Sequence, residues 1–156
     1  MTAPTEAAAA RALIDRSQYL TLATADPEGR PWVSPVWFAH EDYEEFFWVS
    51  RPDARHSLNL QVRPALALVV FDSTVTPEEA QAVYVEADAE QVGAEALDHA
   101  VGVYSQKSAG SGLRAWSAAD VSGAASHRLY RARAVAAFAL AATDRRAPIS
   151  LRGTER

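Results

Sequence analysis

Cysteine is absent from the 156-residue chain. Without thiols the protein can form no disulfide and no zinc ribbon, and it offers no cysteine nucleophile or cysteine ligand for an iron–sulfur cluster. Redox chemistry in such a chain would have to come from a bound cofactor.

Lysine is almost absent as well: Lys107 is the single lysine, and the net charge at pH 7 is −5. Proteins bind nucleic-acid phosphates mainly through clustered Lys and Arg. Most of the arginines here are dispersed along the chain, which is typical of a solvated surface. We therefore expect no nucleic-acid partner.

Long hydrophobic runs are also missing. No stretch approaches the roughly 20 apolar residues that a membrane span needs. Residues 1–10 lack both the basic start and the continuous apolar middle of a secretory signal. We expect a cytoplasmic protein without membrane contact. Its length and 49% hydrophobic content suit one domain with its own core, residues 1–156.

Motifs for metal binding and hydrolysis do not appear. The four histidines, at positions 40, 56, 99 and 127, lack the spacing of metal ligands, and no Gly-x-Ser-x-Gly elbow is present. Residues 110–115 fit a loose dinucleotide pattern, but they follow a predicted helix where the motif requires a strand. No metal site is therefore predicted, and His127 is interpreted as a surface residue at a strand edge.

What the chain does contain is a series of β-type segments. Alternating or continuous apolar patterns predict six strands, at residues 19–24, 31–40, 45–50, 65–71, 81–92 and 127–140. Helical spacing predicts helices at 5–16, 54–62 and 94–107, and a helical turn at 118–121. The tail, residues 143–156, is expected to be loosely ordered.

The first three strands are joined by short turns, which predicts an antiparallel meander. Pro31 and Pro35 indicate that the second strand is an edge or bulged strand, because proline donates no ladder hydrogen bond. The whole pattern favours a mainly β fold, a small barrel with flanking helices.

The junction between the third strand and the following helix gathers groups that suit an anion. They come from Ser50, Arg51, Arg55 and His56. A helix N-terminus offers free amides and a positive dipole, and guanidinium groups add charge, so the junction predicts a phosphate site. Asp53 is the expected helix cap. The alternative is that the arginines pair with Asp53 or Glu45 and that His56 lies on the helix surface.

Aromatic side chains are concentrated in the two strands before this junction. They are Trp32, Trp37, Phe38, Phe47 and Trp48. Flat apolar walls beside a phosphate site would suit a phosphorylated planar ring. Taken singly, each of these aromatic residues is more often part of a protein core.

The ordered segments at 19–38, 47–50, 55–60 and 64–71 resemble the FMN-binding split-barrel proteins of the pyridoxamine 5′-phosphate oxidase-like family. The resemblance covers roughly residues 12–92. It implies a six-stranded antiparallel split β-barrel and a homodimer that binds its cofactor at the subunit interface.

The resemblance also implies individual roles. Ser50, Arg55 and His56 match residues that bind the flavin phosphate, and Ser34, Pro35, Val36 and Trp37 match those beside the ring and ribityl chain. Arg51 and Asn59 are further candidates for cofactor binding, and Trp48 is a candidate wall of the ring site.

We therefore expect an FMN-dependent oxidoreductase that acts on an unidentified small organic substrate, with no side chain assigned as acid or base. The C-terminal substrate segment of the oxidase that makes pyridoxal phosphate is not found, so that reaction is not predicted. One alternative is an F420-dependent reductase, although few basic residues beyond Arg51, Arg55 and Arg63 could bind its acidic tail. The other is a non-catalytic flavin- or haem-binding protein.

Overall fold

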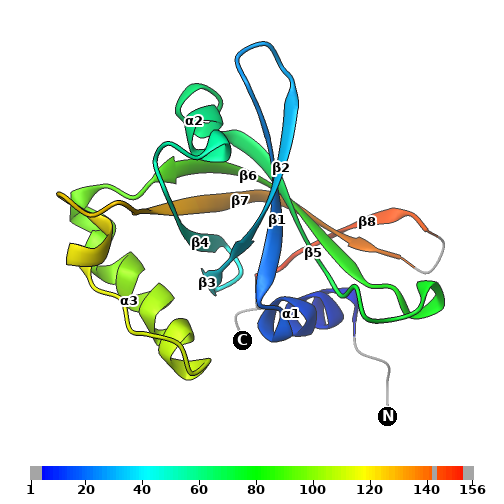
Figure 1. Ribbon diagram of the computed structural model, residues 1–156. Helices are drawn as coiled ribbons and strands as arrows, with labels where there is room; N and C mark the ends of the chain where they lie inside the picture. Colours follow the sequence, from blue (N-terminus) through cyan, green and yellow to red (C-terminus); the bar gives the residue numbers. More distant parts are fainter. Residues whose placement is uncertain (1–4, 142–143, 153–156) are drawn as a thin grey trace.

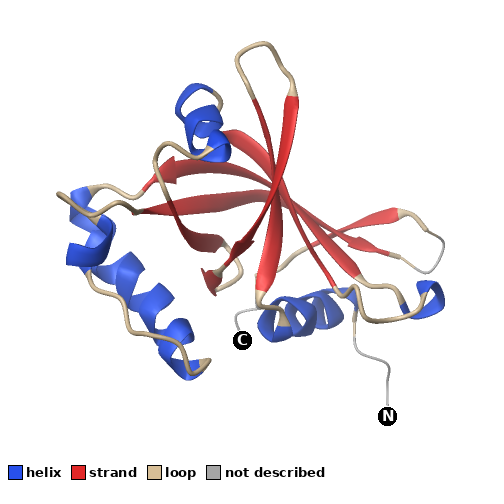
Figure 2. Cartoon of the chain, viewed as in Figure 1, coloured by secondary structure: helices blue, strands red, loops and turns tan. Residues whose placement is uncertain are grey.

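The computed structural model describes residues 5–141 and 144–152, and its strands form one curled antiparallel sheet (Figures 1 and 2). The strands are β1 (Tyr19–Ala25), β2 (Pro31–Trp37), β3 (Ala39–Glu41), β4 (Glu45–Ser50), β5 (Ala65–Phe71), β6 (Ala82–Gln91), β7 (Arg128–Leu140) and β8 (Arg146–Ile149). The α-helices are α1 (Glu6–Arg16), α2 (Arg55–Val62) and α3 (Ala94–Gly110), and the 3₁₀ turns are η1 (Pro77–Glu79) and η2 (Ala118–Val121).

The strands follow the order β2-β1-β5-β6-β7-β4-β3, and β8 pairs with β7. β2 and β3 are the two ends of this order, so the curled sheet keeps two edges. The structure is thus mainly β and of the split-barrel type, with eight strands where six were expected. β2 lies at an edge, as its prolines predicted.

The predicted meander of three strands is wrong. The segment 31–40 divides at Phe38 into β2 and β3, which lie at opposite ends of the sheet order. Phe38 is fully buried, and its amide bonds to the carbonyl of Gln18 before β1 begins. The chain therefore turns inward at this residue, and β3 pairs with β4 while β2 stays with β1.

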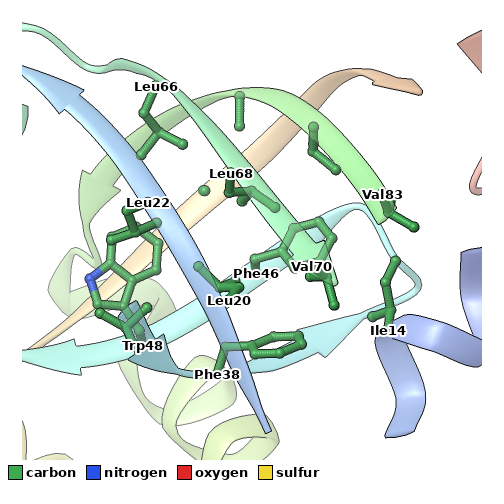
Figure 3. Packing of buried hydrophobic residues seen from close by; sticks show 14 of the residues in the cluster. Ile14, Leu20, Leu22, Phe38, Phe46, Trp48, Leu66, Leu68, Val70 and Val83 are labelled. Carbon is green, nitrogen blue, oxygen red and sulfur yellow. The ribbon is translucent and has the colours of Figure 1, made fainter. Parts of the chain in front are cut away.

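The barrel interior is built from the alternate residues of the strands, as Figure 3 shows. Leu20, Leu22, Leu68 and Val83 point inward together with the large rings of Phe38, Phe46 and Trp48. Helix α1 adds Leu13 and Ile14 to this cluster. Its N-cap, Thr5, accepts a hydrogen bond from the amide of Ala8 at 3.2 Å, which satisfies one free amide of the first turn.

The expectation of a loosely ordered tail is wrong for residues 146–149, which form β8. β4 pairs with only the first part of β7, Arg128 to Arg133, and β8 occupies the open edge beside Ala137 to Leu140. Leu151 then joins the barrel core. Residues 143 and 153–156 of the predicted tail lie outside the described part of the chain.

No helix within residues 5–141 and 144–152 is long and apolar enough to cross a membrane.

Candidate functional site

Helix α2 begins with its first amides uncapped. Ala54 is the N-cap residue and makes no side-chain hydrogen bond, so the predicted Asp53 cap is wrong. Asp53 instead accepts two hydrogen bonds from Arg51, at 2.9 Å from Nε and 3.0 Å from Nη2. The bidentate geometry of the guanidinium explains this preference. The first-turn amides of α2 are left for another acceptor.

Ser50 and His56 meet at this helix start. Ser50 Oγ lies 2.8 Å from His56 Nε2, and Ser50 is buried while His56 is half-buried. Burial lowers the pKa of His56 below its ordinary value, which keeps the imidazole neutral at pH 7. The pair thus offers polar atoms without a fixed charge.

Arg55 supplies the cation of the site. Its guanidinium carbon lies 4.3 Å from the centre of the Trp32 ring, and Trp32 on β2 is 40% exposed. Arg55 makes no salt bridge to a carboxylate within the described residues. The predicted alternative, an ion pair with a neighbouring acid, therefore describes Arg51 and not Arg55.

Buried and exposed hydrogen bonds fasten α2 to the hairpin of β1 and β2. Asn59 Nδ2 donates to Thr24 Oγ1 at 3.0 Å, and both side chains are buried. Arg63 donates to the carbonyls of Asp26 and Pro27, at 2.9 Å each. Asn59, a predicted cofactor contact, is thus engaged within the protein and sets the position of the helix.

The roles of Thr24 and Arg63 were missed in the sequence. A weak signal exists for each: Thr24 occupies an inward position of an alternating strand, and Arg63 directly precedes the proline that ends the helix segment. Neither signal identifies the partner, which is distant along the chain.

The candidate ring strand, β2, presents different faces along its length. Ser34 and Val36 point inward and are buried, whereas Pro35 is exposed. Trp37 is half-buried against Tyr104 of α3, with ring centres 5.1 Å apart in an edge-on contact. Its Nε1 donates to Gln18 Oε1 at 3.0 Å.

The outer edge of β2 carries backbone N–H and C=O groups that bond to no other strand, because β2 pairs only with β1. The bond from the Phe38 amide to Gln18 fixes which residues face β1. Strand alternation then directs the backbones of Val33, Pro35 and Trp37 to the free edge. Proline is tolerated at position 35 for the same reason. This edge can donate and accept hydrogen bonds with a flat heterocycle.

Trp48 stands apart from the other candidates. It is fully buried in the barrel interior and stacks on Tyr130, with ring centres 5.8 Å apart and planes inclined by 14°. The structure thus groups Ser50, Arg55 and His56 with Trp32 around α2 and sets Ser34 to Trp37 along β2, whereas Trp48 is a core residue.

The outer face of the sheet carries two hollows that were not anticipated. One has a volume of about 510 Å³ and is lined by residues that include Val33, Tyr84 and Phe138. The other, of about 480 Å³, shares Ala23 and Ala67 with it. Small alanine side chains at outward positions, such as Ala23 and Ala67, leave this space open. Their alternation with larger residues in the sequence could have predicted a hollow on this face.

A family model described as pyridoxamine 5′-phosphate oxidase matches residues 7–140 of the chain. No curated protein matches the sequence. Several solved structures are similar in fold.

A haem-binding protein from Mycobacterium smegmatis is 18% identical with a TM-score of 0.76, over 96% of this chain and 60% of that one. The chain therefore spans less than two thirds of that protein's length. HutZ, the haem storage protein from Vibrio cholerae, is 22% identical with a TM-score of 0.64, over 80% of this chain and 86% of its own. An F420 reductase is 22% identical with a TM-score of 0.60, over 82% of this chain and 94% of its own. At these identities the likeness shows a shared fold.

Proposed function

The chain belongs to the pyridoxamine 5′-phosphate oxidase family, and from that premise we propose that it is a cytoplasmic, homodimeric, FMN-dependent oxidoreductase acting on a small organic molecule. The observation that carries the proposal is the start of α2. There Arg55, free of carboxylate partners in the described chain, lies beside uncapped amides and the Ser50–His56 pair.

These groups fit a single phosphate. A phosphate monoester carries close to two negative charges and accepts several hydrogen bonds. Arg55 would supply the charge, and the first-turn amides of α2 and the Ser50 hydroxyl would supply donors. His56, neutral in the free protein, can take up a proton when an anion arrives beside it.

The ring would lie along the free edge of β2, where Val33 and Trp37 can donate backbone hydrogen bonds. When bound, FMN supplies the hydride chemistry, which no side chain of this cysteine-free protein can perform. The protein's own part is to hold the phosphate, orient the ring and limit the access of water. No residue is assigned here as an acid or base.

F420 is the less favoured cofactor, although one similar structure is described as an F420 reductase. Its acidic tail needs several available cations. Of the three arginines considered for it, Arg51 is paired with Asp53 and Arg63 donates to hairpin carbonyls. Arg55 alone remains, which suits one phosphate better than a chain of carboxylates.

A non-catalytic haem-binding role is the second class of function. Two similar structures are described as haem proteins. Each histidine already has a side-chain partner at one ring nitrogen. These contacts join His40 to Asp15, His99 to Glu41, His56 to Ser50 and His127 to Ser126. Iron would have to displace one of these partners or bind the second ring nitrogen, and this engagement favours FMN over haem.

A second copy of the chain is the proposed occupant of the hollowed outer face. Val33 is 57% exposed there, and Val135, at the irregularity between β6 and β7, is 69% exposed. An apolar hollow beside a projecting apolar side chain suits a twofold contact, in which each surface meets its own copy. The position of Val33 on β2 would bring this interface next to the proposed ring edge.

The proposal is tested by the visible spectrum of the purified protein, followed by titration with FMN, F420 and haem. Binding of FMN well below the millimolar range, with F420 and haem weaker, is the expected result. Turnover of a reduced nicotinamide in the presence of FMN would distinguish an enzyme from a binding protein. If FMN fails to bind below the millimolar range, the proposal is wrong.

A further inference from the structure

Residues 94–126, named here the α3 lobe, form an excursion between two paired strands. The chain leaves the sheet after β6 and returns at β7, and the amide of Val92 bonds to the carbonyl of Leu129 across the base. Figure 1 shows α3 and the yellow segment after it along one side of the sheet. Both connections of the lobe to the sheet thus lie side by side at its base, and its far end is joined to the rest of the protein only by non-covalent contacts.

The α3 lobe has a hydrophobic cluster of its own. Ala100, Val101 and Tyr104 of α3 contact Phe47 and Leu129 on the outer face of β4 and β7. This cluster is separate from the one inside the barrel. Undocking of the lobe would therefore leave the barrel interior closed.

Side-chain hydrogen bonds join α3 to the rest of the described chain at two places. His99 Nε2 lies 2.9 Å from a carboxylate oxygen of Glu41 on β3. Farther along, Lys107 Nζ donates to the carbonyl of Ser17, the C-cap of α1, at 3.0 Å. At ~1.5 Å per residue, Lys107 is roughly 20 Å from the start of α3. It therefore fastens the free end of the lobe.

Within the described residues no carboxylate lies within salt-bridge distance of Lys107, so the Ser17 carbonyl and the Trp37 and Phe38 rings are what compensate its charge. The groups that face it are Asp15 on α1 and His40 on β3, but the Asp15 oxygens are each 3.0 Å from a group of His40 or Tyr43. The ammonium lies 4.0 Å from the centre of the Phe38 ring. Burial lowers the pKa of Lys107 to about 8.

We propose that the α3 lobe is a hinged cover over Trp37, that Lys107 is its latch, and that the latch holds more firmly when Lys107 is neutral. When the lobe is docked, the Lys107 ammonium loses its hydration water. In exchange it gains the Ser17 carbonyl as acceptor and contacts with the Trp37 and Phe38 rings. A neutral amine can still donate to Ser17 and loses much less hydration. The cover acts through the chain's own residues and does not depend on which cofactor binds.

Proton linkage gives the direction of the effect. In the undocked lobe Lys107 returns toward its ordinary pKa, so docking releases a proton and strengthens as the pH rises from below 8 toward 10.5. Between pH 7 and pH 9 the docking equilibrium should rise about tenfold. His99 acts in the opposite direction. Glu41, and more weakly Glu45, raise the pKa of His99, so the support that its contact with Glu41 gives to docking is lost as the pH rises through this raised pKa.

Single cysteines can report the opening, because the chain has none of its own. Ala100→Cys places a thiol beneath α3, Gly102→Cys places one on the exposed face of the same helix, and Ala132→Cys places one inside the barrel. A Cβ at Gly102 meets no atom within 4 Å. The reactivity of the thiol at 100 relative to 102 should fall about tenfold from pH 7 to pH 9. The thiol at 132 should react more slowly than that at 100 throughout.

Substitutions of the latch separate its charge from other effects. Lys107→Arg keeps the charge at both pH values and Lys107→Met removes it, so both should abolish the pH dependence, whereas His99→Gln should keep it. Equal relative reactivity at the two pH values in the parent protein, or a retained change in Lys107→Arg, would overturn the proposal. So would a thiol at 132 that reacts as fast as the one at 100.

The unsubstituted protein offers an independent measurement. A lysine-specific protease can cleave this chain only after Lys107, and cleavage requires the lobe to open. Its rate, relative to a short lysine peptide, should fall from pH 7 to pH 9 by a similar factor. A constant relative rate would refute the latch.

Discussion

Arg51 and Arg55 lie four positions apart and do different things. Arg51 is held in a bidentate, exposed ion pair with Asp53, whereas Arg55 lies over the Trp32 ring with no carboxylate partner within the described chain. An exposed ion pair adds little stability, but it occupies the guanidinium. Availability, rather than sequence position, therefore distinguishes the two as phosphate ligands.

Arg55→Ala is expected to weaken FMN binding by about 1.5–3 kcal/mol, the usual loss for a hydrogen bond to a charged group. Arg51→Ala is the matched control and should change the affinity much less. Flavin fluorescence titration measures both. Unchanged affinity in Arg55→Ala would remove this residue from the phosphate site.

His40 provides a test of pH dependence. Burial lowers its pKa despite the bond to Asp15, so the unfolded chain takes up this proton at a higher pH than the folded protein. Its contribution is present above about pH 6.5 and is lost as the pH falls through the lowered folded value. We expect the free energy of unfolding, measured in urea, to fall less between pH 7.5 and pH 5.5 in His40→Gln than in the parent protein. An equal loss would contradict this assignment.

At the scale of elements, the position of α2 decides the geometry of the candidate site. The buried bond between Asn59 and Thr24 ties the helix to β1, and Arg63 ties its end to the hairpin turn. These contacts hold Arg55 over β2. Local propensity alone would leave so short a helix marginal.

Asn59→Ala should cost about 1–3 kcal/mol in the free energy of unfolding, because it leaves the buried Thr24 hydroxyl without its donor. The double variant Asn59→Leu with Thr24→Val removes both polar groups and should recover much of that loss. Denaturant unfolding measures both variants. A double variant that loses the sum of the effects of Asn59→Leu alone and Thr24→Val alone would show that the two residues act independently.

Much of the element pattern could be predicted because it is local. A continuous apolar run identified β5 at residues 65–71, and alternation identified the inward Val83, Val85 and Ala87 of β6, as the structure has them. The division at Phe38 and the pairing of β8 could not be predicted, because they depend on which edges the curled sheet leaves open. The absent Asp53 cap has a similar cause: Arg51 competes for the carboxylate.

The sequence placed the predicted phosphate ligands together at the start of α2, but it did not predict their contacts. The junction from Ser50 to His56 is where the structure leaves helix amides free, since strand and helix are adjacent in sequence. The partners Thr24 and Trp32 lie 35 and 23 positions before Asn59 and Arg55, and no local pattern assigns them to α2. Trp48 belongs to the core because β4 turns it inward, opposite Tyr130.

For the whole molecule, the hollowed outer face of β1, β5 and β6 is the surface on which assembly depends. The face combines apolar hollows with exposed valines, as in surfaces that bind a partner. A homodimer through this face would place the free edge of β2 beside the second subunit.

Ala67→Arg should prevent the self-association, because it places a long charged side chain in the floor shared by both hollows. Glu78→Arg, on the exposed η1 turn, is the control with a changed charge. Light scattering after size exclusion should give twice the chain mass of 16.9 kDa for the parent and the control, and a single chain for Ala67→Arg. A parent protein that is monomeric at micromolar concentration would contradict the dimer.

The most direct test of the account compares FMN with riboflavin, which lacks the phosphate, in the parent protein and in Arg55→Ala. If the start of α2 binds the phosphate, FMN should bind at least tenfold more tightly than riboflavin to the parent. In Arg55→Ala most of that difference should disappear while riboflavin binding stays the same. Equal affinity of the parent protein for FMN and riboflavin would show that the phosphate is not held there, and the central claim would be wrong.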